Sequence, residues 1–173
     1  ATSNGSRRPL AAYRVGVQIT IRRHQLRLTQ TFTIARGSTD TDEVVSVELD
    51  HDGITAYGEG AAVDYHGETA ASMERFLHEH AAAAIGDDPF ALQAISRRLA
   101  EIPGNSGAKM ALDGALHDWI GKRAQQPLWR LYGIDAAAMP PTSFTIGIGS
   151  VEAAATRARQ SRQYHVLKVK VGG

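Results

Sequence analysis

The sequence predicts an α+β domain, built as a three-stranded antiparallel meander followed by helices, which leads into a β-α-β unit. Three observations point to this fold class. Over the first third of the chain, apolar and polar residues alternate as they do in half-buried strands. The period then changes to that of amphipathic helices. Near the end, two apolar runs flank one helical segment, a pattern typical of two parallel strands with a crossover helix.

The meander is predicted from the segments before residue 60. Valine and isoleucine occupy alternate positions from Val15 to Ile21, and Leu26 and Leu28 resume the alternation. Asp50-His51-Asp52-Gly53 is typical of a hairpin turn. The expected elements, in order, are a strand over 13–29, a loop over 32–41, a strand over 44–49, a turn over 50–53 and a strand over 54–59.

Helical periodicity governs the middle of the chain. Helices are expected over 69–84, 89–100 and 105–123, with a short helical piece over 127–132. The third is the clearest, because an apolar stripe runs from Ala108 to Ile120. Asn105 is its predicted N-cap. Asp113 and His117 lie four residues apart on this helix and can pair.

A linker with Pro140-Pro141 precedes the β-α-β unit, which is expected as a strand over 143–148, a helix over 151–163 and a strand over 164–171. The predicted organisation is therefore a disordered lead-in over 1–11, a first domain over 12–139 and the start of a second domain over 140–173. The two strands of this second domain should be parallel.

Composition excludes several classes of function. Among 173 residues the formal net charge is +1, a balance that gives no support for a nucleic-acid or membrane-surface partner. The chain has no cysteine, which fits a reducing compartment and excludes thiolate metal sites. No apolar stretch approaches the roughly 18 residues of a membrane span. We therefore expect a soluble cytoplasmic protein.

The strongest chemical signal is the pair Lys168 and Lys170 in the last predicted strand. Side chains two apart on a strand point to the same face, so the two ammonium groups share one side of the sheet. Because two like charges held close make it costly to protonate both, one lysine is predicted to serve as a general base. The alternative is a solvated edge strand protected from aggregation by lysine.

Six segments in this order resemble the enolase superfamily, in particular the muconate-lactonizing-enzyme subgroup and its dipeptide epimerases of the L-Ala-D/L-Glu type. The resemblance extends from about residue 12 to the end of the chain. The segments are Phe32-Thr33-Ile34-Ala35-Arg36-Gly37, Tyr57-Gly58-Glu59-Gly60, Tyr65-His66-Gly67-Glu68-Thr69, Ala111-Leu112-Asp113-Gly114-Ala115-Leu116-His117-Asp118, Thr142-Ser143-Phe144-Thr145-Ile146 and Leu167-Lys168-Val169-Lys170-Val171-Gly172.

The resemblance implies an α+β capping domain followed by the first β-α-β of a (β/α) TIM-like barrel. Members of the family remove the proton α to a carboxylate, while a bound Mg²⁺ stabilises the enediolate. Lys170 would then be the acid/base on one face of the substrate. Lys168 would favour the neutral form of Lys170 and help to hold the carboxylate. No metal ligand is expected on this chain, and Glu59 is read as structural.

The resemblance also implies residues that contact the substrate. Two loops of the cap would close over the site, and the first barrel strand would line it. The expected substrate-binding residues are Phe32, Ile34, Arg36, Tyr65, His66 and Thr145. Three alternatives stay open: Phe32 and Ile34 could belong to the core of the cap, Arg36 could be a solvated charge, and Thr145 could be an ordinary strand residue.

A complete barrel takes about 250 residues, so we expect this chain to be the first part of a longer, homo-oligomeric enzyme and to be inactive alone. In the family the Mg²⁺ ligands and the second base lie on later strands. The predicted activity is epimerisation of dipeptides. Alternatives are o-succinylbenzoate synthase, N-acylamino acid racemase or muconate cycloisomerase activity, and, from another class, a non-catalytic binding or assembly module.

Gly147-Ile148-Gly149 lacks the third glycine of a dinucleotide fingerprint and is not read as a site.

Overall fold

The computed structural model describes residues 16–64 and 67–172. Its first part is the predicted antiparallel meander, with strands β1 (Gln18–Ile34), β2 (Gly37–His51) and β3 (Ile54–Ala61) in the order β1-β2-β3. The predicted turn over 50–53 joins β2 and β3, and Gly53 adopts a positive φ of 71° there. The expected lead-in over 1–11 falls outside the described residues.

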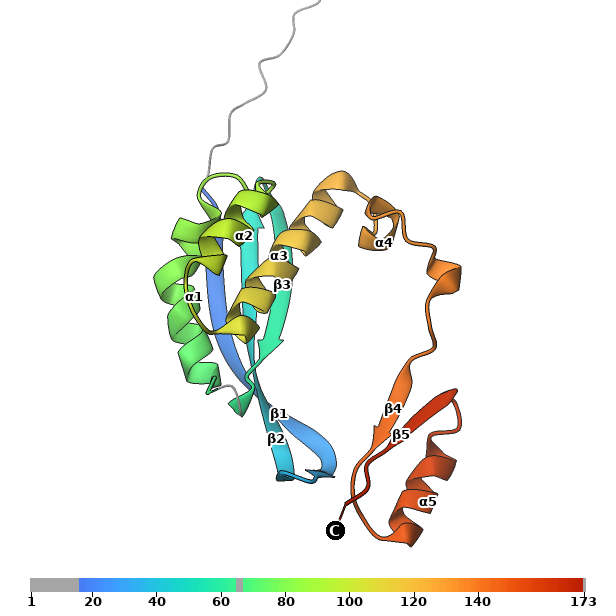
Figure 1. Ribbon diagram of the computed structural model, residues 1–173. Helices are drawn as coiled ribbons and strands as arrows, with labels where there is room; N and C mark the ends of the chain where they lie inside the picture. Colours follow the sequence, from blue (N-terminus) through green and yellow to red (C-terminus); the bar gives the residue numbers. More distant parts are fainter. Residues whose placement is uncertain (1–15, 65–66, 173) are drawn as a thin grey trace, which may run out of the picture.

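The loop expected over 32–41 is wrong, because these residues continue the β1–β2 hairpin (Figure 1). Phe32 pairs with Thr39 and Ile34 pairs with Gly37, so the tip of the hairpin is a tight turn. The register shifts between Arg27 and Phe32. The outer part of the hairpin lacks apolar alternation because it extends beyond the core. Polar pairs link its two strands, as where the Thr31 hydroxyl donates to Oδ1 of Asp40 at 2.5 Å.

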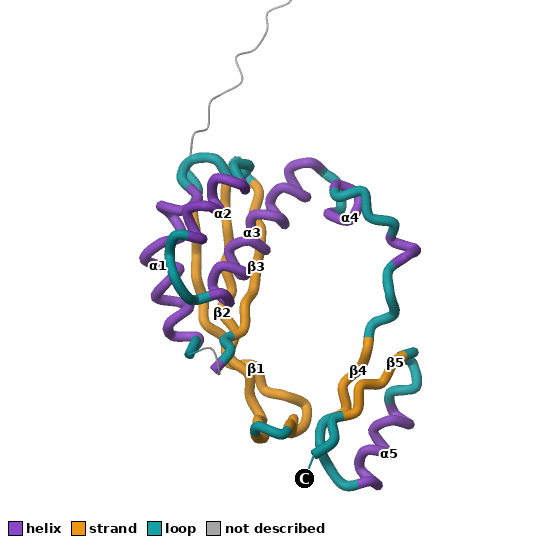
Figure 2. Tube along the Cα trace, viewed as in Figure 1, coloured by secondary structure: helices purple, strands orange, loops and turns teal. Residues whose placement is uncertain are grey.

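Helices α1 (Ala70–Ile85), α2 (Leu92–Ala100) and α3 (Ser106–Ala124) cover one face of this sheet (Figure 2). All three were predicted. α2 begins three residues later than expected, because Asp88 holds Phe90 in a turn through its side-chain oxygen (2.9 Å) and Ala91 through its carbonyl (3.1 Å). Thr69 caps α1 in a reciprocal capping box with Ser72.

The core lies between this face and the helices. Alternate residues of β2 point into it, and the predicted stripe of α3 packs against them. The most deeply buried members, all less than 2% exposed, include Val45, Val47, Leu49, Met73, Leu77, Ile85, Ile95, Leu112, Leu116 and Trp119.

α3 packs directly on β3 because two glycines of that strand leave room for its backbone. A Cβ at Gly58 would lie 1.9 Å from the Ala111 carbonyl oxygen, and one at Gly60 would lie 2.2 Å from the Gly107 carbonyl oxygen. Neither distance is possible between real atoms. The Tyr57-Gly58-Glu59-Gly60 segment therefore serves helix-on-sheet packing, as its structural reading predicted.

After α3 the chain passes through α4 (Leu128–Leu131) and the short 3₁₀ helix Ala136–Ala138. The predicted β-α-β unit follows as β4 (Ser143–Ile146), α5 (Val151–Gln160) and β5 (Val166–Val169). The two strands are parallel, as expected. In Figure 1 this unit lies away from the three covering helices, and the tip of the β1–β2 hairpin reaches towards it.

Candidate active site at the ends of β4 and β5

Lys168 and Lys170 lie where β5 runs out at its carboxyl end. The parallel register pairs Thr145 with Lys168 and Ile146 with Val169, and the amide of Lys170 donates to the Ile146 carbonyl at 2.9 Å. Side chains directly opposite each other on neighbouring strands share a face. Thr145, Lys168 and Lys170 therefore lie on one face, with Lys168 exposed and Lys170 half-buried.

The tip of the β1–β2 hairpin docks onto the end of β4 through its main chain. The Ile148 amide donates to the Thr33 carbonyl at 2.8 Å. Inside the hairpin, the Thr33 and Ser38 hydroxyls lie 2.8 Å apart and bridge the two strands close to the turn. Segments more than a hundred residues apart in the sequence thus meet in one backbone hydrogen bond.

Two glycines mark how closely the hairpin approaches the strand ends. A Cβ at Gly147 would lie 3.1 Å from the Thr33 carbonyl oxygen, 3.2 Å from the Thr33 nitrogen and 3.5 Å from Cδ2 of Phe32. A Cβ at Gly172 would lie 3.9 Å from Cβ of Ala35. The hairpin tip therefore sits over the ends of both strands.

The structure brings several of the predicted site residues into one region. Thr145 and the two lysines share one face of the β4–β5 sheet, and Phe32 packs at Gly147, beside the strand ends. Ile34 is half-buried and Arg36 is exposed in the turn of the hairpin. None of these hairpin residues belongs to the core of the cap between sheet and helices.

The second predicted cap loop is described only in part, since Tyr65 and His66 lie outside the described residues. Glu68, just after them, was not predicted to have a role. It is 7% exposed, and its carboxylate accepts from the Ser106 amide (2.6 Å), the Ser106 hydroxyl (2.9 Å) and the Gly107 amide (3.1 Å). This carboxylate caps α3 and anchors the segment after the loop.

Asn105 does not cap α3 as predicted. It occupies the N-cap position with a left-handed backbone (φ 52°), and its side chain makes no capping hydrogen bond. The reason is that Glu68 already occupies the first amides of the helix with a full negative charge. The predicted Asp113–His117 pair is present, with Oδ2 and Nδ1 3.2 Å apart.

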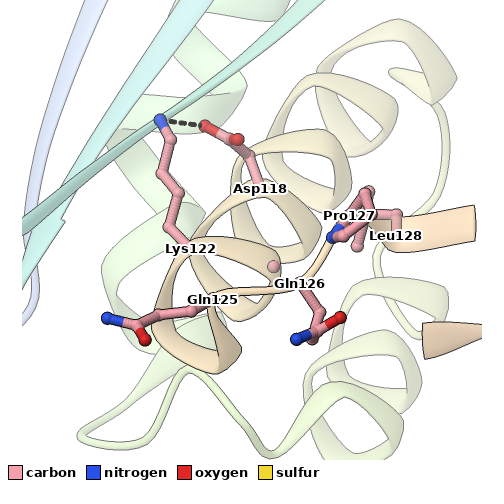
Figure 3. Close-up of a pocket in the computed structure, with 7 residues that line it drawn as sticks. Asp118, Lys122, Gln125, Gln126, Pro127 and Leu128 are labelled. Atoms are coloured by element: carbon pink, nitrogen blue, oxygen red, sulfur yellow. Dashed lines mark hydrogen bonds and ion pairs between the residues drawn. The ribbon is translucent and has the colours of Figure 1, made fainter. Parts of the chain in front are cut away.

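A hollow beside α3 is a separate feature, shown in Figure 3. It has a volume of about 370 Å³ and lies at the carboxyl end of α3, lined in part by Asp118, Lys122 and Gln125. Lys122 is committed to structure there, since Nζ lies 2.7 Å from Oδ2 of Asp118 and donates to the Thr55 carbonyl at 2.9 Å. Asp118 also accepts from the Tyr57 amide (2.8 Å), so both side chains serve the outer edge of β3.

Among the described residues, no three histidine, aspartate or glutamate side chains gather closely enough to hold a metal ion. The residues at the strand ends do not fit Mg²⁺, which prefers carboxylate and other oxygen ligands, whereas two lysines share this face. Among all the residues that the structure describes, no helix is both long enough and apolar enough to cross a membrane.

The arrangement defines a class: an α+β capping domain whose hairpin covers the strand ends of a β/α barrel segment that carries a Lys-x-Lys pair. The comparison with known families agrees. Residues 16–133 match the N-terminal domain of the mandelate racemase/muconate lactonizing enzyme family, and the chain belongs to that family.

Individual relatives are epimerases and racemases. The chain is 34% identical over 151 residues to an L-Ala-D/L-Glu epimerase of Bacteroides thetaiotaomicron, covering 86% of this chain and 39% of the relative. It superposes with a TM-score of 0.82 on a dipeptide epimerase of Enterococcus faecalis complexed with Mg and L-Leu-L-Tyr, at 32% identity, 90% coverage of this chain and 45% of that one.

An N-succinyl Arg/Lys racemase of Bacillus cereus gives the same TM-score of 0.82, with 31% identity, 91% of this chain and 44% of that chain covered. The chain thus spans less than half the length of each of these relatives.

Proposed function

We propose that this chain is the first part of a dipeptide epimerase, and that the complete enzyme inverts the α-carbon next to a dipeptide's carboxylate. The observation that carries the proposal is the position of Lys168 and Lys170, which share one face at a parallel strand end beneath a docked cap hairpin. The family membership and the epimerases among the relatives support it.

In the proposed reaction, neutral Lys170 takes the proton from the α-carbon. The C–H bond breaks, an N–H bond forms, and the electron pair moves into the carboxylate to give an enediolate. Lys168, on the same face as Lys170, supports it by attracting the substrate carboxylate. Return of a proton to the opposite face completes the inversion.

A 1,1-proton transfer needs a second base, which we propose lies in a further part of the complete enzyme. Mg²⁺ is the proposed cofactor, as in the Enterococcus faecalis complex. It would stabilise the negative charge that develops on the carboxylate. Because the described residues offer no oxygen cluster for it, its ligands too would come from elsewhere in the enzyme.

The experiment follows exchange of the α-proton in D₂O by NMR, using the complete enzyme, Mg²⁺ and a panel of L,L-dipeptides. Lys170→Ala should abolish exchange and epimerisation from its own face, a loss of roughly a thousandfold or more for a group that takes the proton directly. Lys122→Ala, which removes a lysine of the structural hollow, is the matched control. Unchanged epimerisation in Lys170→Ala would contradict the proposal, because inversion needs proton transfer on both faces.

The second candidate is racemisation of N-acylamino acids, favoured by the similarity to the N-succinyl Arg/Lys racemase. The proton transfer is the same, so Lys170→Ala cannot separate the two. The substrate can: exchange with N-succinyl amino acids but not with dipeptides would establish this candidate. A complete enzyme that binds no Mg²⁺ in calorimetry and exchanges no α-proton would instead favour a non-catalytic binding or assembly module.

For the complete protein we propose a cytoplasmic, homo-oligomeric enzyme whose partner is a small molecule. The lack of cysteine supports the compartment, and the dipeptide in the Enterococcus faecalis complex supports the small-molecule partner. The homo-oligomeric state rests on the family resemblance alone. Size-exclusion chromatography with light scattering of the complete enzyme tests the oligomeric state.

A further inference from the structure

The contact between the cap hairpin and β4 is made by main-chain atoms on both sides. Thr33 offers its carbonyl to the Ile148 amide at 2.8 Å, and the same carbonyl oxygen and the Thr33 nitrogen face the bare Cα of Gly147. A side chain at position 147 would crowd this contact, because a Cβ there would be 3.1 Å and 3.2 Å from these two atoms.

Gly147 also occupies a defined place relative to the lysines. The register pairs Ile146 with Val169, and the ladder continues through the hydrogen bond from the Lys170 amide to Ile146. One further step places Gly147 opposite Lys170, so the direction of its missing side chain and that of the Lys170 side chain belong to the same face. The hairpin backbone therefore rests on the face that carries the lysines.

We infer that Gly147 is a positioning residue, which seats the Thr33 main chain so that the hairpin tip is held over Lys168 and Lys170. The inference rests on the proposed function. Gly147 itself touches neither substrate nor proton. It acts through the hairpin, whose Phe32, Ile34 and Arg36 we propose as substrate contacts.

The size of the side chain at position 147 should then control the position of the hairpin. An alanine brings its Cβ within 3.1 Å of Thr33, so the hairpin must withdraw by a few tenths of an ångström. A valine adds methyl carbons about 1.5 Å further out and forces a larger withdrawal. Gly149 is the matched control, because a Cβ there would meet only Cβ of Ala153, at an ordinary 3.8 Å. Neither glycine has a positive φ, so L side chains fit both backbones.

A disulfide cross-link measures the position of the hairpin tip without an activity assay. Cβ atoms at Ala35 and Gly172 are 3.9 Å apart, within the roughly 3.5–4.5 Å that a disulfide needs, and the chain has no other cysteine. Ala35→Cys/Gly172→Cys should therefore cross-link under mild oxidation with oxidised glutathione. Ala35→Cys/Arg130→Cys should not, since Arg130 is in α4, which lies well apart from the hairpin tip (Figure 1).

The cross-linking is then repeated with a third substitution. In the Gly147→Val background the cross-linking rate should fall about tenfold, because disulfide formation requires near-contact geometry, and Gly147→Ala should give an intermediate rate. Gly149→Val should leave the rate unchanged. Circular dichroism and thermal unfolding of each variant show whether the fold is retained, and the alanine variant keeps the test valid if valine unfolds the chain.

Kinetics of the complete enzyme supply the second measurement. A displacement near 1 Å can cost about a hundredfold, so Gly147→Val should lower kcat/KM towards that extent, mainly through KM. Its pH profile should match that of the unmodified enzyme, because the lysine strand has not moved. Gly149→Val should resemble the unmodified enzyme in both respects.

The outcomes separate the inference from the proposed function. Equal cross-linking in the Gly147→Val and Gly149→Val backgrounds, no cross-link at all in the Ala35→Cys/Gly172→Cys chain, or a shifted pH profile would each overturn the positioning role. Cross-linking of this chain as expected, together with a complete enzyme that acts on no dipeptide and no N-acylamino acid, would refute the proposed function. In that case the seat remains a structural contact without a catalytic purpose.

Discussion

Gly58 lies on β3 directly beneath α3, and its replacement by alanine tests how the capping domain is held together. The added Cβ would be 1.9 Å from the Ala111 carbonyl oxygen and 2.5 Å from the Ala115 nitrogen. Both are backbone atoms of a helix, so no change of rotamer can move them aside. To reach ordinary contact at about 3.5 Å, α3 must lift from the sheet by roughly 1.5 Å at this point.

The cost of that movement follows from the contacts it disturbs. Inserting atoms into a well-packed core costs about 1–3 kcal/mol. The lift also strains two hydrogen bonds between α3 and the edge of β3, from the Tyr57 amide to Asp118 (2.8 Å) and from Lys122 to the Thr55 carbonyl (2.9 Å). Each is worth about 1 kcal/mol. We expect Gly58→Ala to lower the free energy of unfolding by about 3 kcal/mol or more.

Chemical denaturation followed by circular dichroism gives this free energy, and thermal unfolding should show a Tm at least about 6 °C lower. Gly114→Ala is the matched control on the helix side of the same contact. Its Cβ would lie 3.5 Å from Cα of Gly58, an ordinary distance. Alanine in a helix is favoured over glycine by about 1 kcal/mol, so this variant should be more stable. A Gly58→Ala protein within about 0.5 kcal/mol of the unmodified chain would refute the packing argument.

Two further predictions concern buried polar groups. Glu68→Gln removes the charge at the start of α3. Because hydrogen bonds to charged groups contribute about 1.5–3 kcal/mol, chemical denaturation should show a free energy of unfolding lower by an amount in that range. Glu79→Gln, at an exposed position, is the control, and an equal response of both variants would contradict the capping role. Trp119→Phe deletes the indole donor to the His51 carbonyl (3.0 Å) and leaves that carbonyl without this partner, so the free energy of unfolding should fall by about 1–3 kcal/mol. A change below about 0.5 kcal/mol would show that the bond contributes nothing.

The parts of the fold that could be predicted from sequence are those that local periodicity encodes. The alternation from Val15 to Ile21 and the stripe from Ala108 to Ile120 each report which face of an element meets the core. The distal half of the β1–β2 hairpin could not be found in this way. Residues 32–34 pair with 37–39 outside the core, so no apolar face is required of them and no period in the sequence marks the strands.

The candidate site likewise has features that a local sequence pattern predicts and features that depend on distant residues. The Lys-x-Lys pair is a local pattern, and strand geometry alone places both side chains on one face. The role of Glu68 depends on an amide 38 residues away, and no spacing rule connects the two. In the sequence Gly147 belongs only to an incomplete dinucleotide motif, because a glycine does not show which backbone will approach it. The role that we infer for Gly147 comes only from its contact with the Thr33 backbone in the folded structure.

Gly58 and Gly147 meet the same physical requirement in two places. At Gly58 the missing side chain lets two main chains approach more closely than any other residue would allow, and at Gly147 it spares the hairpin a shift of a few tenths of an ångström. The first contact sets the shape of the cap, and the second sets where its hairpin lies above the lysines. Because the second contact uses the backbone of Thr33, the side chains at positions 34 and 36 can differ without loss of the seat. Main-chain docking can therefore hold the hairpin in one place whatever side chains its turn carries, including those that we propose as substrate contacts.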